Sequence, residues 1–153
     1  MKSDEKPIRR NIVQEKSFDF ALEIIRLSRR LQHDCKESLL SRQLVRSGTS
    51  IGANIEEAIA AQSKKDFLAK MQIAMKEARE THYWLRLIYR SGLTVGPDID
   101  ALLRHCTELI TILSSITLTT RQNLALNKPF HPSDCGNSSL HIPHSQLGAR
   151  RKP

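Results

Sequence analysis

Cysteine is scarce in this sequence, and its spacing matches no common structural pattern. The three cysteines, Cys35, Cys106 and Cys135, are an odd number and include no CxxC pair. A secreted disulfide framework and a zinc ribbon both require paired cysteines at characteristic spacings, so both are disfavoured. The N-terminal residues lack the apolar core of a signal peptide, and no run reaches the roughly 18 apolar residues of a membrane span. We therefore expect a cytoplasmic protein without a membrane partner.

Motifs that identify common catalytic sites are also lacking. The glycines that follow Ser47 are not succeeded by the Lys-Ser/Thr of a phosphate-binding loop. No serine lies in a nucleophile elbow, and the Glu-x-x-His pattern of di-iron bundles is missing. The C-terminal residues His131, Cys135, His141 and His144 are of zinc-binding types, but low-complexity segments produce such spacings easily. We predict no enzymatic activity, no metal and no cofactor.

Aromatic residues make up only 5% of the chain. The apolar residues are mostly Leu, Ile and Ala, which favour helices that pack on helices. Four segments carry them at helical spacing, beginning near Lys16, after Glu37, after Ser63 and at Pro97. Short connections make successive helices antiparallel neighbours. We predict an all-α fold, an antiparallel up-down-up-down four-helix bundle over residues 16–123, with a flexible N-terminal arm at 1–15 and a disordered, basic and His-rich tail at 124–153.

Local signals mark the predicted helix ends. The pairs Asp34/Glu37 and Ser63/Asp66 have the spacing of N-terminal capping boxes, the first before the second helix and the second before the third. Because the third helix starts at Ser63, we expect the second helix to end near Gln62. A helix that ends at Arg90 is followed by Gly92, which suits the left-handed conformation common after helices.

Two glycines interrupt the second predicted helix without breaking its apolar period. Gly48 and Gly52 each cost roughly 1 kcal/mol relative to alanine in a helix interior, so a compensating interaction is expected. Close approach of a neighbouring helix is the favoured explanation, and a kink is the alternative.

Four polar residues lie at the edges of apolar stripes. Asn54 and Glu57 are one helical turn apart, as are Glu77 and Glu80. A partly buried carboxylate needs a cation or a hydrogen-bond donor, which Arg46, Asn54 or an arginine of another subunit would supply. We interpret the four residues as a structural polar layer that fixes helix register. A metal or acid/base site on Glu77 and Glu80 is the lesser alternative.

Positive charge exceeds negative charge, with a formal net charge of +8. Phosphate neutralisation by Lys and Arg gives affinity for nucleic acid without sequence preference. In a monomer these residues form an ordinary solvated surface, whereas in a ring they would form continuous positive belts. Aromatic side chains that could stack on bases are few, so base-specific readout is not expected. The candidate nucleic-acid-binding residues are Arg26, Arg29, Arg30, Arg42, Arg46, Arg86 and Arg90.

The run of motifs along the central helices resembles a known family. These motifs are Gln43-Leu44, Ser50-Ile51, Ala53 to Glu57, Ser63, Asp66-Phe67, Ile73-Ala74 and Glu80-Thr81. Together they resemble the bacterial four-helix-bundle proteins encoded in intervening sequences of 23S ribosomal RNA genes, over about Phe18 to Ser115. The sharpest element is the Ser-Ile-x-x-Asn-Ile-x-Glu core that begins at Ser50.

This resemblance implies a bundle that assembles into a ring, commonly a homopentamer, without enzymatic activity. A relative of the family is the accessory variability protein of diversity-generating retroelements, which implies binding of RNA or DNA and of a reverse transcriptase. Two positions depart from the family pattern: Ala58 replaces a usual glycine, and Glu77 replaces a small residue. The leading hypothesis is an oligomer that binds nucleic acid without sequence specificity. The alternative is a protein-protein interaction scaffold that makes no nucleic-acid contact.

Overall fold

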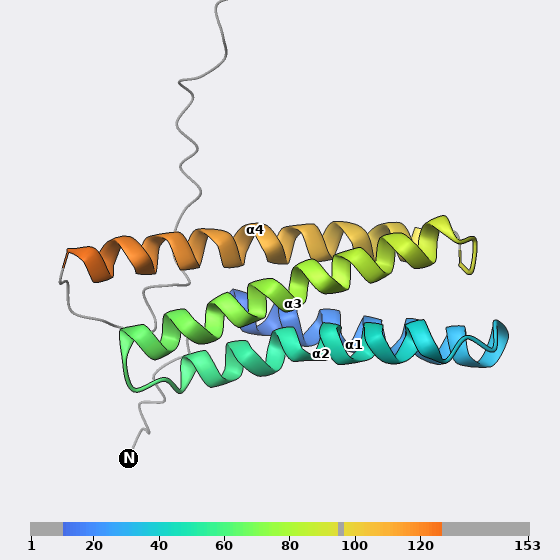
Figure 1. Ribbon diagram of the computed structural model, residues 1–153, viewed down its shortest axis with the longest axis horizontal. Helices are drawn as coiled ribbons and strands as arrows, with labels where there is room; N and C mark the ends of the chain where they lie inside the picture. Colours follow the sequence, from blue (N-terminus) through green and yellow to red (C-terminus); the bar gives the residue numbers. More distant parts are fainter. Residues whose placement is uncertain (1–10, 95–96, 127–153) are drawn as a thin grey trace, which may run out of the picture.

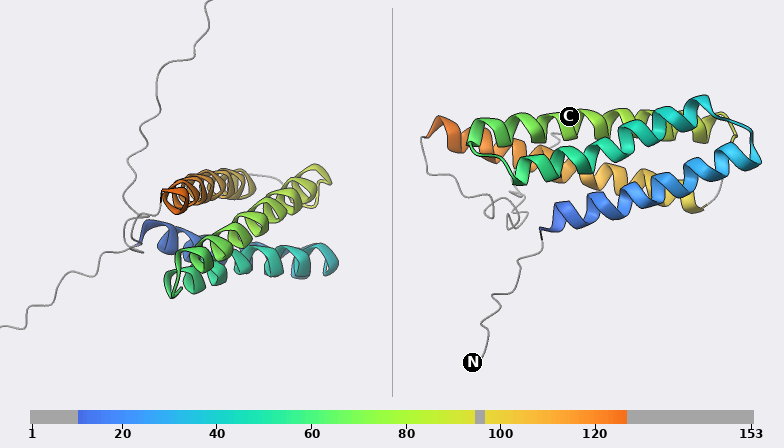
Figure 2. Two further views of the ribbon diagram at one scale, coloured as in Figure 1. Left: turned by 60° about the vertical axis from the view of Figure 1, so that its left-hand side comes forward. Right: turned by 90° about the horizontal axis from the view of Figure 1, so that it is seen from below.

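The computed structural model describes residues 11–94 and 97–126, which form four α-helices (Figure 1). The helices are α1 (Ile12–Asp34), α2 (Leu39–Ile59), α3 (Lys64–Arg90) and α4 (Pro97–Ala125). Successive helices run in opposite directions along a common long axis, and the right-hand view of Figure 2 places α2 between α1 and α3. The predicted all-α, up-down bundle is confirmed for the described part of the chain.

The bundle extends further at both ends than the sequence predicted. α1 begins at Ile12 and not at Lys16, because Asn11 caps it by accepting a hydrogen bond from the backbone N–H of Val13 at 3.3 Å. α4 continues to Ala125. The predicted arm at 1–15 and tail at 124–153 are therefore too long where they overlap these helices. The remainder of both segments, including the four C-terminal His and Cys residues, lies outside the described residues.

The start of α2 differs from the predicted capping box. Asp34 is the last residue of α1, and the N-cap residue Ser38 makes no side-chain capping bond. Instead, Oε1 of Glu37 accepts hydrogen bonds from the backbone N–H groups of Leu39 at 2.8 Å and Leu40 at 2.9 Å. The helix ends at Ile59, short of the predicted Gln62.

The predicted ends of α3 agree with the structure. The hydroxyl of Ser63 accepts a hydrogen bond from the backbone N–H of Asp66 at 3.1 Å. After Arg90 the chain turns through Gly92, whose φ of 74° lies in the left-handed region that glycine adopts without strain. Both connections that flank α3 thus follow local sequence signals.

Each helix contributes one apolar stripe to a single core. The fully buried side chains include Phe20, Ile24, Leu44, Ile51, Phe67, Met71, Leu85 and Ile88. The glycines of α2 lie where α1 crosses it. A Cβ built on Gly48 would lie 2.8 Å from Cγ2 of Ile24, and one on Gly52 would lie 3.6 Å from Oγ of Ser17. Close helix approach, the favoured explanation for these glycines, is confirmed at Gly48, whereas at Gly52 a Cβ would make only an ordinary contact.

One described helix, α4, is long and apolar enough over Asp98–Ala125 to cross a membrane, judged by length and composition alone. The core helix of a bundle passes the same test. Leu102, Cys106, Leu109 and Leu113 of α4 are buried in the common core.

Candidate nucleic-acid interface

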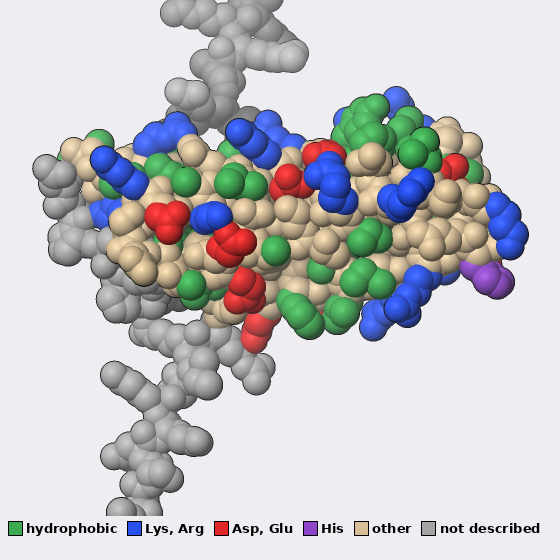
Figure 3. Space-filling view, turned by 60° about the horizontal axis from the view of Figure 1, so that its bottom comes forward, with side chains coloured by type: hydrophobic (Ala, Val, Ile, Leu, Met, Phe, Trp, Pro, Cys, Tyr) green, Lys and Arg blue, Asp and Glu red, His purple; other side chains and the backbone are tan. Residues whose placement is uncertain are grey.

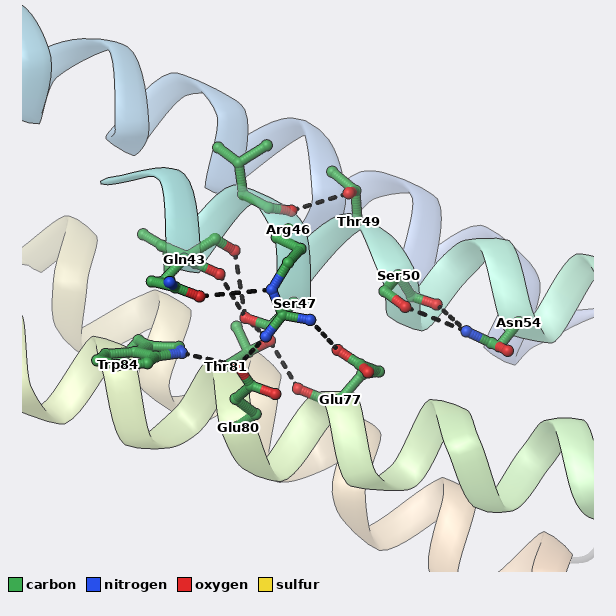
Figure 4. Close-up of polar contacts among 12 residues, drawn as sticks. Gln43, Arg46, Ser47, Thr49, Ser50, Asn54, Glu77, Glu80, Thr81 and Trp84 are labelled. Atoms are coloured by element: carbon green, nitrogen blue, oxygen red, sulfur yellow. Dashed lines mark hydrogen bonds and ion pairs between the residues drawn. The ribbon is translucent and has the colours of Figure 1, made fainter. Parts of the chain in front are cut away.

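A cluster of charged side chains lies where the outer surfaces of α2 and α3 meet (Figure 4). Arg46 of α2 forms an ion pair with Glu80 of α3, and its Nη1 lies 3.8 Å from Oε2 of Glu77. Nε1 of Trp84 donates a hydrogen bond to Oε1 of Glu80 at 3.1 Å. Arg46 is therefore the partner of both carboxylates, one of the options that the sequence left open.

Glu77 is the least satisfied member of this cluster. Its side chain is only 18% exposed, and its Oε2 is buried without a hydrogen-bond partner among the described residues. The 3.8 Å separation from Arg46 is too long for a hydrogen bond. A buried carboxylate oxygen without a donor is costly, and the long contact with Arg46 offsets this cost only in part.

Asn54 and Glu57, the other two residues of the predicted polar layer, make separate contacts. The side-chain amide of Asn54 donates to the backbone carbonyl of Ser50 at 2.8 Å. Glu57 forms a separate ion pair with Lys70. The hydrogen bond and the negative charge of Glu57 raise the pKa of Lys70.

The hydrogen bonds between core-facing polar side chains were missed by the sequence analysis. Thr81 of α3 donates to the hydroxyl of Ser47 on α2 at 3.0 Å, with both residues fully buried. The hydroxyls of Ser28 and Ser41 likewise pair between α1 and α2. The available signal was the presence of hydroxyl residues at core-facing positions of otherwise apolar stripes.

The seven predicted arginines are spread over three helices. Arg30 pairs with Asp98 of α4 at 2.6 Å, and Nε of Arg42 donates to the backbone carbonyl of Ser38 at 3.3 Å. Arg46 is engaged as described above. On the face shown in Figure 3, basic side chains are interspersed with acidic and apolar ones. The seven residues therefore do not form one patch.

A row of exposed basic residues lies along α3, and we call it the α3 basic stripe. It consists of Lys76, Arg79, Arg86 and Arg90, with Tyr83 at its centre. The spacings of three, four, three and four residues place all five on one side of a helix. All five are exposed. None of the four cations forms an ion pair within the described part of the chain. At 1.5 Å per residue the stripe is about 21 Å long.

Only two residues of this stripe, Arg86 and Arg90, were predicted as binding residues. Lys76 and Arg79 were missed, although the helical spacing that relates them to Arg86 is readable in the sequence. His82 lies beside the stripe. Burial and, to a lesser extent, the positive charge of Arg86 lower the pKa of His82. This shift favours the neutral form of His82, so the positive charge of the stripe comes from Lys and Arg.

Two hollows open along the seam between α1 and α4. Their volumes are about 310 Å³ and 260 Å³, and both are lined by Arg30 and Asp98. In residues 11–94 and 97–126, no group of three or more His, Cys, Asp or Glu side chains is placed to hold a metal ion. Glu77 and Glu80 were the alternative candidates for a metal site. In the structure, Arg46 lies beside both carboxylates, and Trp84 donates a hydrogen bond to Glu80.

Comparison with known proteins gives two findings. The family model of the 23S rRNA-intervening sequence protein matches residues 9–115. The chain is similar to the crystal structure of a protein of unknown function from the S23 ribosomal protein family of Bacteroides thetaiotaomicron. The two share 45% sequence identity with a TM-score of 0.67, over 69% of this chain and 97% of that chain. No functionally curated protein matches the sequence.

Proposed function

The chain belongs to the 23S rRNA-intervening sequence protein family, and we propose that it is a non-enzymatic, oligomeric helical bundle that binds the backbone of RNA or DNA without sequence specificity. The oligomer is a ring, with five subunits as the family resemblance implies. In this role the protein acts as an accessory to a nucleic-acid enzyme, for which the retroelement resemblance suggests a reverse transcriptase.

The α3 basic stripe is the observation that carries this proposal. Its four cations are exposed and have no ion-pair partner among the described residues. No acidic residue occupies a position of this stripe, and the neighbouring Glu80, one turn from Lys76, forms an ion pair with Arg46. Successive phosphates of one strand in a duplex rise by about 3.4 Å, so a surface of about 21 Å spans several phosphates. Repetition around a ring would multiply this surface.

The same surface favours binding without sequence preference. Long basic side chains on a convex helix reach phosphates, and phosphate contacts carry no base information. Two exposed tyrosines, Tyr83 and Tyr89, lie on α3, where a base of any type can stack on a ring. We therefore expect single-stranded RNA and DNA of mixed sequence to bind with similar affinities.

The experiment compares two double variants that remove the same charge. Arg86→Gln with Arg90→Gln removes two stripe cations, and Arg26→Gln with Arg42→Gln removes two cations elsewhere. Fluorescence anisotropy with a mixed-sequence single-stranded oligonucleotide should show a clear loss of affinity for the first variant only. The slope of log K against log salt should become shallower by about 1.4 for that variant, because each lost phosphate contact contributes ~0.7. Equal losses in both variants would attribute binding to net charge and not to the stripe.

A protein-protein scaffold is the competing function. It is favoured by exposed apolar side chains, among them Phe18 at 62% and Leu39 at 62% exposure. This function predicts no oligonucleotide binding even at low salt, together with a protein partner that remains bound after nuclease treatment.

A further inference from the structure

Two exposed apolar surfaces remain after the bundle closes, and they lie on different helices. The first, which we call the α1 face, consists of Phe18, Leu22, Ile25 and Arg29. Phe18 is 62% and Leu22 38% exposed, and Ile25 is half-buried. Spacings of four, three and four residues align these side chains on one side of α1. Arg29 is exposed and has no ion-pair partner in the described part of the chain.

The second surface, which we call the α3 acidic face, consists of Ile73, Glu77, Glu80, Trp84 and Leu87. It repeats the alternation of four and three residues along α3. Ile73 is 39% and Leu87 37% exposed, so apolar side chains flank the two carboxylates. This face lies on the side of α3 toward α2, about a quarter turn away from the α3 basic stripe.

Charge distinguishes the two faces and makes them complementary. The α1 face is apolar with a free guanidinium at its end. The α3 acidic face holds Oε2 of Glu77, which is buried and has no hydrogen-bond partner among the described residues. A guanidinium offers five N–H donors in a planar arrangement that suits a carboxylate. The side chains of Glu77 and Glu80 are 18% and 34% exposed, so an arginine from outside the subunit can reach the accessible part of both carboxylates.

We propose that the α1 face of one copy of this chain docks on the α3 acidic face of a second copy, with Arg29 directed at the Glu77 and Glu80 carboxylates. The inference rests on the proposed oligomer and assigns its interface. α1 and α3 are diagonal in the bundle, since each packs on α2 and α4 and hardly on the other. The two faces therefore point in different directions from one subunit. A contact between unlike faces is heterologous, and such contacts form a ring when the rotation between successive copies closes and an open filament when it does not.

Mixing two disabled variants tests this arrangement directly. Phe18→Asp destroys the α1 face and Leu87→Asp destroys the α3 acidic face, and both side chains are exposed enough for the fold to tolerate the change. By light scattering coupled to size exclusion, each variant alone should have the 17.4 kDa mass of a monomer. An equimolar mixture should form a dimer of twice that mass, because one intact α1 face meets one intact α3 acidic face. Leu118→Asp on α4, at 57% exposure, is the matched control and should keep the wild-type mass.

Each outcome has a defined meaning. Monomeric variants that form a dimer on mixing support the proposal. Arg29→Glu should also assemble more weakly than wild type, whereas Arg42→Glu should assemble as wild type does. Variants that keep the wild-type mass, or monomers that stay monomeric on mixing, overturn the assigned interface while leaving the oligomer intact. A monomeric wild-type protein overturns the oligomer itself. Circular dichroism checks folding, and the pair Leu22→Asp and Ile73→Asp replaces any variant that loses helicity.

Discussion

Arg46 leaves α2 beside two carboxylates of α3, and this placement determines how its charge is used. The sequence supported two roles for it, as a surface cation for phosphate and as the partner of Glu77 and Glu80. The structure shows the second contact. Exposed ion pairs contribute only ~0–1 kcal/mol to stability, but the pairing makes Arg46 less available to nucleic acid than Arg86. The choice depends on how α2 is rotated about its axis, which residue spacing alone does not specify.

The two glycines of α2 should respond oppositely to alanine. At Gly48 a Cβ would lie 2.8 Å from Ile24, whose branched side chain is stiff and must shift. We expect Gly48→Ala to destabilise the protein by about 1–3 kcal/mol. At Gly52 the nearest atom is at 3.6 Å, an ordinary contact, so Gly52→Ala should be neutral or stabilising by up to ~1 kcal/mol through helix propensity. Urea unfolding measures the change in unfolding free energy for each variant. Equal changes would contradict a closer approach of α1 at Gly48 than at Gly52.

Cys106 should make stability fall at alkaline pH. Burial raises the pKa of this thiol from 9.0 to about 12. The unfolded chain therefore loses the proton first, and the stabilisation present below pH 9 is lost as the pH rises toward 12. The expected slope from this group is at most about 1.4 kcal/mol per pH unit. Other groups titrate in the same range, so the measurement is the difference in unfolding free energy between wild type and Cys106→Ala. A difference that does not change with pH would contradict a buried, neutral thiol.

The four helices differ in how far local sequence specified them. α3 was predicted at both ends because Ser63 and Gly92 act through their own backbone and immediate neighbours. The start of α1 was missed because its cap, Asn11, follows a polar, charged stretch that carries no apolar period. α2 was placed correctly but given the wrong cap, since Glu37 acts from a turn that also contains Lys36 at a φ of 55°. Apolar periodicity thus identifies the helices, whereas their ends depend on single polar side chains.

Removing the cap of α3 tests this distinction. Ser63→Ala deletes the hydroxyl that accepts from the N–H of Asp66, and we expect a loss of ~1 kcal/mol. Ser38→Ala at the start of α2 is the matched control, because the Ser38 side chain makes no capping bond. Thermal unfolding followed by circular dichroism should separate the two variants. Similar losses would show that the α3 cap contributes no more than an ordinary surface hydroxyl.

The arrangement of charge on the whole molecule was predicted only in part. The net excess of +8 is a property of composition and is visible without a structure. The α3 basic stripe depends on helical spacing, and two of its cations were predicted. Whether each remaining arginine forms an ion pair depends on the Asp and Glu side chains of other helices, as Arg30 of α1 and Asp98 of α4 show. Such pairs form between residues far apart in the chain, so no local pattern reports them.

The dependence of oligonucleotide affinity on salt tests the proposed function most directly. If one stripe of four cations neutralises four phosphates of a single strand, log K should fall with log salt with a slope of about −2.8 or steeper. A ring that engages several stripes would steepen the slope further. Fluorescence anisotropy of the wild-type protein with mixed-sequence RNA and DNA, titrated at several salt concentrations, gives this slope. No binding at low salt, or an affinity that does not change with salt, would contradict a backbone-binding surface on α3.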